Sequence, residues 1–460
     1  MKQRLEQERV ALLASIGIEP KDTCKLVLDG GEPTLDSPHR LALAAATALA
    51  VQASAMVALW RARAGCPQNI RINSIRALNG LRTGLLQSIH GHPVPISAAA
   101  ASPVSNFYQT KDGRWIHPMG TYPALRDGIL ELLECANSPA SISSAIARWD
   151  AFDLEEAIAE RRLSGAVVRT RQEWNEHEQA RVLASAPLIT VEKVGESPPV
   201  PLPVASNPLS GIRVIDFTHV IAGPTLSKSL AEQDADVLRL VSPRFPDPYE
   251  FILDTGWGKR SAYLDLDIYG NSEKLTTLLT QADVFVQSWS PGSLSRRGLS
   301  TDQIVTQRPG IVIASISAYG HEGPWAARKG FEQLAQAVSG VAAAEAGPDG
   351  RPRFVPTALL ADYLAAYLGA AGVAAALKRR VSEGGSYHVQ VSLAGCAMWV
   401  QQLGLTQRDP LGQLAFAPLD ERDTPFGRLR HLPPIVDFEH TPSRWKLPPT
   451  TPGANEALWL

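Results

Sequence analysis

The chain of 460 residues has little of what marks several large classes of protein. Its four cysteines, Cys24, Cys66, Cys135 and Cys396, share no CxxC or other metal-binding spacing, which is typical of reduced thiols in a cytoplasmic protein. The formal net charge is only −2, so the composition gives no basic footprint for nucleic acid or an anionic membrane. The first residues are charged and amphipathic, without the apolar core of a secretory signal. We therefore expect a cytoplasmic protein.

Motifs of several familiar enzyme classes are absent too. The sequence has no Walker A, HExxH or GxSxG motif and no metal-type cluster, so we expect no metal site. The apolar run nearest in length to a membrane span, residues 357–377, contains Asp362 and is followed by a Lys-Arg-Arg turn. Its many small residues favour a tightly packed buried helix over a span.

The chain does contain enough apolar residues to form a large core. The chain is 45% hydrophobic and 20% charged, which for this length predicts two or three domains. The proline-rich stretch 195–209 (GESPPVPLPVASNPL) is typical of an extended linker. It separates a first half, residues 1–194, from a second domain, residues 210–408. The last residues, 409–460, are rich in proline and predict an extended segment that wraps over the rest.

The second half alternates strand and helix patterns. Short β-branched runs predict buried parallel strands, and helical stretches lie between them, which predicts an α/β fold with a doubly wound, Rossmann-like sheet. The strands are expected at 212–217, 237–241, 284–286 and 311–316, with helices such as 225–233 and 272–281. The first half predicts a smaller α+β domain with a hairpin at FYQTKDGRWIH. Its helices are expected at 41–62, 122–136, 141–149 and 153–163.

An internal repeat joins the two halves. Residues 56–75 and 374–393 both run from a small-residue helix through a basic turn and a glycine-containing loop into an alternating strand. When Leu59 is aligned with Leu377, Ala44 falls at the position of Asp362. The pattern predicts a partial internal duplication in which one copy carries the carboxylate, although two amphipathic units of this kind can also match by chance.

Basic residues and a helix start suggest an anion site. The turn at 222–224 leads into a predicted helix, and helix N-termini bind phosphate groups. Cations lie near the carboxyl ends of the predicted strands, where open α/β sheets bind ligands; they are Arg239, Lys259, Arg260, Arg296 and Arg297. A polyphosphate ligand and a solvated basic face both fit this pattern. His219 fits both a catalytic base and a structural residue at a strand end.

Asp362 is the best candidate for a reactive side chain. Its neighbours Leu359, Leu360, Ala361 and Tyr363 are apolar or aromatic, so an ionised carboxylate there is partly desolvated unless it has a partner. Carboxylates act as covalent nucleophiles in several enzymes. An N-cap for the alanine-rich helix that follows is the structural alternative.

Residues 209–393 resemble the family III CoA-transferases, the CaiB/BaiF family that includes formyl-CoA and carnitine CoA-transferases. The resemblance rests on ordered segments: GIRVIDFTHVIAGP, ADVLRLVSP, GKRSAYLDLD, ADVFVQSWSPGSLSRRGLS, IVIASISAYGHEGPW, the Asp362 helix and YHVQVSL. The first half resembles the later part of the same family through FYQTKDGRWIH and AVVRTRQEWNEHEQARVLASAPL, and the last residues resemble its closing segment. The resemblance implies two truncated copies, the first without the CoA-binding sheet and the second without the small domain.

The resemblance also implies an activity: CoA transfer between an acyl-CoA and a carboxylic acid, with Asp362 as the nucleophile. CoA is then substrate and product, and no tightly bound cofactor is expected. The implied CoA pocket consists of His219, Val220, Ala222, Lys259, Trp289, Arg296 and Tyr319. The chain departs from the family pattern where Ser288 replaces an Asn, Ser317 a Lys, Ile221 a Gln and Ser242 an Arg.

Two other functions share this resemblance. The related acyl-CoA racemases need a His–Asp pair, but Phe331 stands where the His belongs, so racemase activity is disfavoured. A CoA-binding protein without catalysis is the second alternative, because four pocket positions are replaced and one copy lacks the Asp. Members of the family form interlocked homodimers, so we expect this chain to build one active site as a single-chain pseudo-dimer. Further pairing into a homo-oligomer stays open.

Overall fold

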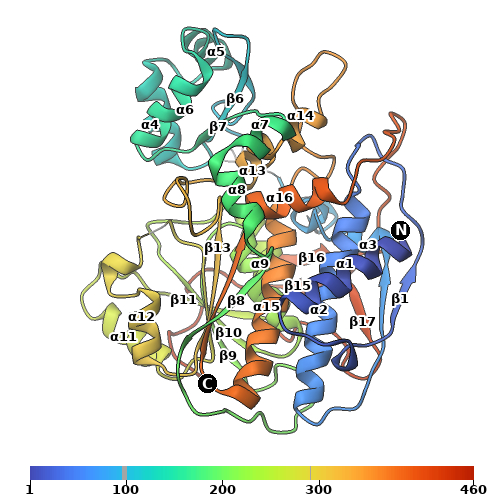
Figure 1. Cartoon of the computed structure of the whole chain (residues 1–460). Coiled ribbons are helices and arrows are strands. Elements are labelled where there is room, and N and C mark those ends of the chain that lie inside the picture. Colours follow the sequence, from blue (N-terminus) through green and yellow to red (C-terminus); the bar gives the residue numbers. More distant parts are fainter. Residues whose placement is uncertain (96–100, 291) are drawn as a thin grey trace.

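The computed structural model describes residues 1–95, 101–290 and 292–460, and a seven-stranded sheet forms its centre (Figure 1). The strand order is β11-β10-β9-β12-β13-β14-β8, and neighbours are parallel except for β14 with β8. The strands are β8 (Thr190–Gly195), β9 (Arg213–Phe217), β10 (Asp236–Val241), β11 (Lys259–Tyr263), β12 (Val284–Gln287), β13 (Val312–Ser317) and β14 (Ser386–Ser392).

Helices cover both faces of this sheet. α9 (Ala222–Glu232) and α15 (Ala361–Glu383) pack on one face, where β-branched residues such as Val214 and Val284 join the main core. α11 (Asn271–Leu279) and α12 (Thr301–Gln307) cover the other face over a second core cluster. The predicted doubly wound α/β sheet is therefore confirmed.

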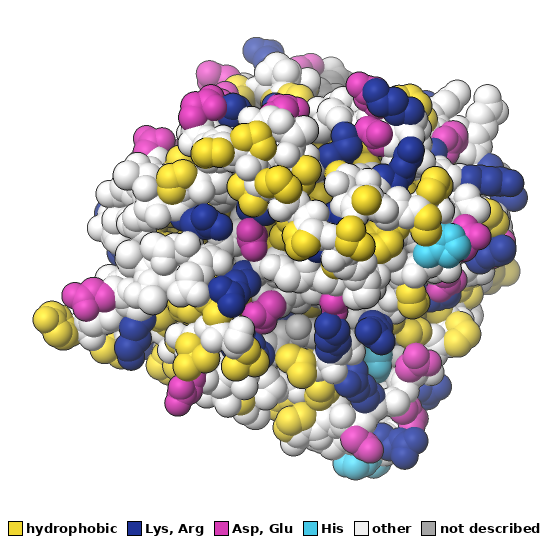
Figure 2. Space-filling view, turned by 90° about the horizontal axis from the view of Figure 1, so that it is seen from below, with side chains coloured by type: hydrophobic (Ala, Val, Ile, Leu, Met, Phe, Trp, Pro, Cys, Tyr) yellow, Lys and Arg dark blue, Asp and Glu magenta, His cyan; other side chains and the backbone are white. Residues whose placement is uncertain are grey.

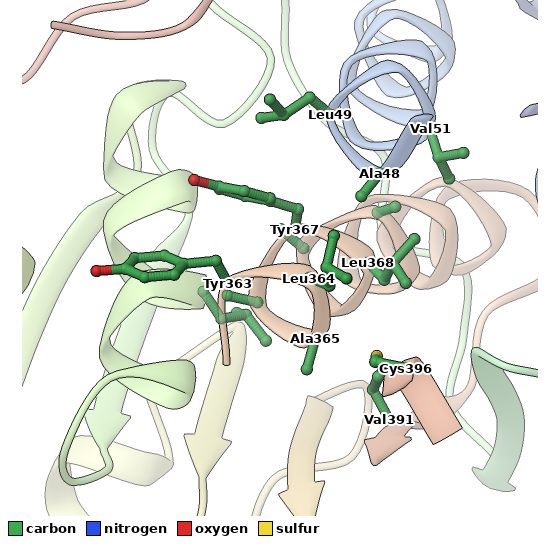
Figure 3. Packing of buried hydrophobic residues seen from close by; sticks show 14 of the residues in the cluster. Ala48, Leu49, Val51, Tyr363, Leu364, Ala365, Tyr367, Leu368, Val391 and Cys396 are labelled. Carbon is green, nitrogen blue, oxygen red and sulfur yellow. The ribbon is translucent and has the colours of Figure 1, made fainter. Parts of the chain in front are cut away.

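The longest helices of the two halves pack along each other. α2 (Leu41–Ala62), at the predicted bounds, lies against α15, and Figure 3 shows Ala48 of α2 beside Leu368 of α15. Both helices are rich in alanine, so their backbones approach closely. Within the described residues α2 is the helix long and apolar enough to cross a bilayer, but its apolar stretch is completely buried inside the protein. Both α2 and α15 are therefore core helices.

A smaller unit in the first half has a core of its own. Helices α4 (Pro123–Leu133), α5 (Pro139–Ile146) and α6 (Ala151–Glu160) pack on a three-stranded sheet of β5 (Tyr108–Gln109), β6 (Trp115–Pro118) and β7 (Gly165–Val167). It forms the upper left of Figure 1. β5 and β6 are the predicted hairpin, and Gly113 in their turn has the positive φ that such a turn requires.

The remaining elements connect these units. They are α1 (Lys2–Ser15), η1 (Pro20–Asp22), β1 (Leu26–Asp29), β2 (Ile70–Asn73), α3 (Ser74–Asn79), η2 (Thr83–Leu86), β3 (Ser88–Ile89), β4 (His92–Pro93), α7 (Arg171–Glu176), α8 (Glu178–Ser185), α10 (Tyr249–Thr255), η3 (Ser295–Arg297), α13 (Glu332–Ser339), α14 (Val341–Ala344), α16 (Leu393–Gln402), β15 (Asp420–Thr424), β16 (Gly427–His431) and β17 (Val436–Phe438).

Strands cross the predicted boundaries between the parts of the chain. β8 belongs to the first half by sequence, yet it pairs with β14 at the edge of the large sheet. β16 and β17 of the last segment pair with β3 and β2 of the first half. That segment is thus partly a hairpin rather than extended throughout. The division of the chain into domains remains a prediction.

The two proposed repeat copies have the same order of elements, α2–β2–α3 and α15–β14–α16. In each copy the strand pairs in parallel with a neighbour, β2 with β1 and β14 with β13. Ala44 lies near the start of α2, as Asp362 lies near the start of α15. An internal duplication remains a prediction that this order is consistent with.

Charges of both signs are mixed on the surface seen from below. Figure 2 shows Lys and Arg side chains interspersed with Asp, Glu and apolar ones on that face. This fits the small net charge of −2.

Candidate active site

The carboxyl ends of β9 and β12 form the crevice in which doubly wound sheets bind ligands, because the direction of strand addition reverses between these strands. His219 follows β9 and Trp289 follows β12. Their rings meet edge to face, with centroids 4.6 Å apart. The structure thus brings these two predicted pocket residues together at the expected position.

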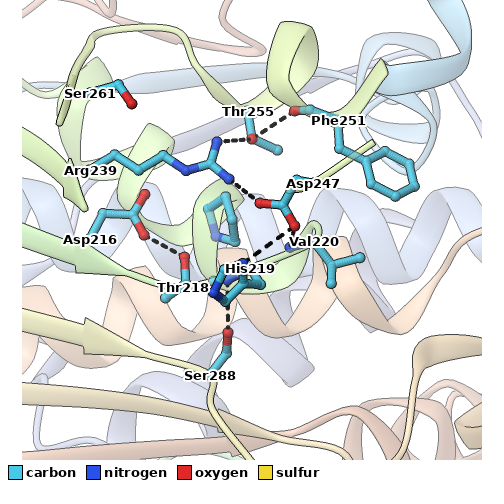
Figure 4. Close-up of polar contacts among 12 residues, drawn as sticks. Asp216, Thr218, His219, Val220, Arg239, Asp247, Phe251, Thr255, Ser261 and Ser288 are labelled. Atoms are coloured by element: carbon cyan, nitrogen blue, oxygen red, sulfur yellow. Dashed lines mark hydrogen bonds and ion pairs between the residues drawn. The ribbon is translucent and has the colours of Figure 1, made fainter. Parts of the chain in front are cut away.

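The turn between β9 and α9 holds a strained residue. Val220 has φ +67°, which β-branched residues rarely adopt, and such strain persists where surrounding contacts fix it. Its N–H donates to Oδ1 of Asp247 at 3.0 Å (Figure 4). Ala222 then begins α9, and Pro224 lies in the first turn, where a missing N–H costs little. The backbone of this turn is therefore fixed beside the crevice.

Asp247, which was not predicted from the sequence, fixes this turn. Its carboxylate also accepts a hydrogen bond from Arg239 and lies 3.5 Å from Nδ1 of His219 (Figure 4). Burial raises the pKa of this carboxyl, but His219 and Arg239 outweigh burial, and the pKa falls below its ordinary value. Asp247 is thus an anion that positions His219. It lies in a loop (RFPDPYE) without any local motif, so the sequence offered no signal for it.

Two of the cations near the crevice are already bound to protein groups. Nζ of Lys259 donates to Asp216 at 2.8 Å and to the carbonyl of Pro224 at 2.6 Å. Burial lowers the pKa of Lys259 to about 8, although Asp216 opposes that shift. Arg239 donates to Asp247 and Thr255. Both cations line a cavity of about 110 Å³, but in this structure their charges are paired with carboxylates of the protein.

The other predicted pocket residues lie further along the same edge. Arg296, in η3, is exposed, and its side chain has no ion pair or hydrogen bond with the residues that the structure describes. Tyr319 follows β13, is buried, and packs edge to face on Trp325. Trp289 lines a cavity of about 310 Å³ at the ends of β12 and β13. Within the described part of the chain, Arg296 is thus the member of the predicted cations that has no ion pair.

Asp362 lies in the first turn of α15, and only 7% of it is exposed. Burial raises its pKa well above the ordinary value, and the nearby charge of Glu332 raises it further. The positive end of the helix dipole favours an anion at this position. Burial and the neighbouring Glu332 thus disfavour the charged form of this carboxyl, whereas the helix start favours it.

Glu332, at the start of α13, caps the helix that carries Asp362. One carboxylate oxygen accepts the N–H of Leu360 at 2.8 Å and the N–H of Ala361 at 3.0 Å. Gln336 also donates to this carboxylate. Burial raises the pKa of Glu332 to about 7, although these hydrogen bonds oppose the shift. The N-cap role considered for Asp362 thus belongs to Glu332, which directly follows Phe331 in the sequence.

Tyr122 brings the first half of the chain to this region. Its ring stacks on Phe331 with centroids 6.1 Å apart, and its hydroxyl donates to Asp247 at 3.3 Å. Burial raises the pKa of Tyr122, and the charges of Asp247 and Asp362 raise it further, so the hydroxyl remains a donor. Tyr122 of the first half is therefore in contact with Asp247 and Phe331 of the second half.

The parallel sheet, with a reversal of strand order between β9 and β12, defines the class, a doubly wound α/β protein. Residues 209–424 match the sequence profile of CoA-transferase family III. Through these residues the chain is similar to that family over slightly less than half of its length.

Curated proteins also match parts of the chain. The acetyl-coenzyme A transferase nodX of Hypoxylon pulicicidum is 31% identical over 320 residues, which cover 65% of this chain and 54% of that protein. The formyl-CoA:oxalate CoA-transferase of Streptomyces coelicolor is 31% identical over 229 residues, 47% of this chain and 55% of that protein. The chain thus spans about half the length of the curated relatives it matches.

Solved structures match a similar share. The crystal structure of Rv3272 from M. tuberculosis has 29% sequence identity and a TM-score of 0.40, over 43% of this chain and 58% of that one. A CAIB/BAIF family protein from Brucella suis has 26% identity and a TM-score of 0.40, over 43% of this chain and 56% of that one.

Proposed function

We propose that this protein transfers CoA from an acyl-CoA thioester to a carboxylic acid, with Asp362 as the covalent nucleophile. The observation that carries the proposal is the buried Asp362 carboxylate at the start of α15, inside the region that matches CoA-transferase family III. The names of matching relatives, acetyl-coenzyme A transferase and formyl-CoA:oxalate CoA-transferase, support the same reaction type.

Transfer proceeds through two anhydrides and one enzyme thioester. The Asp362 carboxylate attacks the thioester carbonyl, which forms a mixed anhydride and releases CoA thiolate. The thiolate attacks the Asp362 carbonyl, which forms aspartyl-CoA and releases the donor acid as a carboxylate. The acceptor carboxylate attacks aspartyl-CoA, and the released thiolate then attacks the acceptor carbonyl of the second anhydride. The acceptor leaves as its CoA thioester and Asp362 is regenerated, so no oxidant or net proton is needed.

The residues around the carboxylate have separate roles in this proposal. Asp362 must be ionised to attack, and Glu332 fixes the helix start that presents it. His219, Val220, Ala222 and Trp289 form the wall along which the thioester arm of CoA lies. Tyr122 contributes from the first half, which supports a single-chain pseudo-dimer with one active site per chain. CoA enters as substrate and leaves as product, and no tightly bound cofactor takes part.

A cytoplasmic setting follows for the same protein. All four cysteines are free thiols, which fits a reducing compartment.

Phe331 argues against racemisation, since its ring is packed on Tyr122 and has no proton to exchange.

Trapping of the enzyme adduct tests the proposal. The protein is incubated with a panel of acyl-CoAs, treated with hydroxylamine or borohydride, digested and analysed by mass spectrometry. We expect modification of the peptide that contains Asp362 and none in Asp362→Asn. Asp302→Asn is the matched control, because Asp302 also lies in the first turn of a helix, α12, but on the surface. An adduct at another residue, or none with any acyl-CoA, contradicts the proposal.

A second candidate is a CoA-binding protein without transfer activity. It is favoured by Lys259 and Arg239, whose charges are bound internally, and by serine at positions 242, 288 and 317. Measurable CoA binding with no adduct from any acyl-CoA supports this candidate. An adduct at Asp362 excludes it.

A further inference from the structure

Two arginines share one carboxylate at the rim of the crevice. Arg244 donates through Nη2 to Asp267, and Arg297 donates through Nε and Nη2 to both oxygens of the same carboxylate at 3.2 Å. Side chains of all three residues are partly exposed, between 37% and 50%. A paired, planar contact of this kind is also the way in which arginine binds phosphate.

The cluster adjoins the aromatic wall of the proposed CoA site. Arg244, Asp267 and Arg297 line a small cavity together with Trp289 and Phe245, and the rings of those two aromatic residues lie 6.1 Å apart. Trp289 in turn contacts His219 at the strand ends. A ligand that lies along this wall beside His219 and Trp289 therefore reaches the two arginines.

The two carboxylates that contact Arg244 differ in how firmly they are held. Asp265 is buried, accepts from Nε and Nη2 of Arg244 and also from Ser242, and the hydrogen bonds from Arg244 lower its pKa to about 2. Asp267 is 43% exposed, and exposed ion pairs contribute little to stability. An incoming anion can therefore displace Asp267 while Asp265 keeps Arg244 in place.

We propose that Arg244 and Arg297 bind a phosphate group of CoA and that Asp267 occupies the position of this phosphate when CoA is absent. This inference rests on the proposed function, since it assigns a subsite for the same ligand. The resemblance leads one to expect an arginine at position 242, where the chain has Ser242. Arg244, two residues further on and held by the same Asp265, supplies the missing cation.

Three other nearby cations are less suited to this role. Lys259 and Arg239 are bound to buried carboxylates, and Arg260 donates to Asp236 and a backbone carbonyl. CoA has phosphate groups in two places, the 3′-phosphomonoester and the diphosphate. Dephospho-CoA, which lacks only the 3′-phosphate, distinguishes the two.

Titration calorimetry with CoA and with dephospho-CoA tests the subsite without turnover. We expect Arg244→Gln and Arg297→Gln each to weaken CoA binding roughly ten-fold or more, because a hydrogen-bonded charge pair is lost. Asp267→Asn, which removes the competing anion, tightens binding. Arg428→Gln is the control, since Arg428 is an exposed arginine paired with Glu421 in the β15–β16 hairpin. Thermal unfolding of each variant verifies that it is folded.

Comparison of CoA with dephospho-CoA shows which phosphate group the subsite binds. If the subsite binds the 3′-phosphate, the arginine variants lose the preference for CoA over dephospho-CoA; if it binds the diphosphate, both ligands weaken equally. Wild-type affinity for CoA in both arginine variants, or weaker binding in Asp267→Asn, overturns the subsite. The Asp362 adduct is scored separately: an adduct with unchanged CoA affinity rejects the subsite alone, and arginine-dependent CoA binding without an adduct rejects the transfer reaction alone.

Discussion

Asp362 combines reactivity with a cost in stability. Its pKa is raised by burial and by Glu332, so its folded state retains a proton more tightly than the unfolded chain does. Such a group stabilises the protein below its ordinary pKa and loses this contribution as pH rises through the raised pKa. At neutral and alkaline pH the carboxylate is therefore destabilising, and a reactive group of this kind is expected to be retained for function.

Asp362→Asn separates these two effects. We expect CoA transfer to fall by about a thousand-fold or more, because the nucleophile is removed, while CoA binding persists. Stability relative to the wild type should increase as pH rises, because the charged form is no longer buried. Activity assays and urea unfolding on both sides of neutrality measure these effects. An active Asp362→Asn contradicts the assignment of the nucleophile.

Glu332→Gln tests the electrostatic coupling between the two carboxyls. Glutamine still accepts the N–H groups of Leu360 and Ala361, but it removes the charge that raises the pKa of Asp362. The attacking form of Asp362 is then available at lower pH, so the ascending limb of the rate–pH profile should shift to lower pH. A limb that stays in place or shifts to higher pH would show that Glu332 acts only through helix capping.

At the scale of elements, α15 depends on small residues where it meets the sheet. A Cβ at Gly372 would lie 2.5 Å from Cγ1 of Val389 on β14 and 3.0 Å from Ile189. Gly372→Ala should therefore destabilise the protein by about 1–3 kcal/mol through overpacking, although alanine favours helix by about 1 kcal/mol at exposed positions. Urea unfolding gives the value.

The double variant Gly372→Ala/Val389→Ala is the control. It removes the methyl group that the new Cβ meets, so the two substitutions should be less destabilising together than the sum of their separate effects. Simple additivity would mean that the clash with Val389 is not the cause.

Sequence periodicity predicted the elements whose burial is uniform. Runs of apolar residues, whatever their long-range contacts, are enough to predict the buried strands near 212–217 and 311–316 and the helix at 41–62. β11 (KRSAY) was missed because Lys259 and Arg260 are polar, and their charges are neutralised by residues distant in sequence. β8 was missed because its place in the sheet depends on pairing with β14 across the linker.

The same limit applies to the site. His219 and Trp289, both named from the sequence, lie together at the strand ends, since strand ends are predictable positions. The role of Asp362 stays a prediction. The partners Asp247 and Glu332 were not named from the sequence, because each is defined by backbone N–H groups that only the fold brings near. Whether a cation such as Lys259 faces ligand or a buried carboxylate likewise depends on tertiary contacts.

At the scale of the whole molecule, the two halves form one body around α2 and α15. β8 completes the large sheet, and β17 of the last segment pairs with β2. The linker itself is exposed at Val204, at 79%. A protease site inserted after Val204 should therefore be cut without separation of the halves, and they should co-elute in size-exclusion chromatography with CoA transfer retained.

The uncut protein with the same insertion is the control for that experiment. Halves that elute separately while each stays folded would contradict a site built from both. Loss of transfer upon cutting, with the halves still together, would show that the linker holds the geometry of the site rather than only connecting its parts.

Transfer of isotopic oxygen tests the central claim, that Asp362 carries CoA covalently. The enzyme turns over an acyl-CoA together with an acceptor acid whose carboxylate is labelled with oxygen-18. The masses of the Asp362 peptide and of the released donor acid are then measured by mass spectrometry. The account predicts that label enters the Asp362 carboxylate and then the donor acid, because each turnover passes one acceptor oxygen through the enzyme carboxyl. CoA transfer with no label in Asp362 or in the donor acid would contradict it.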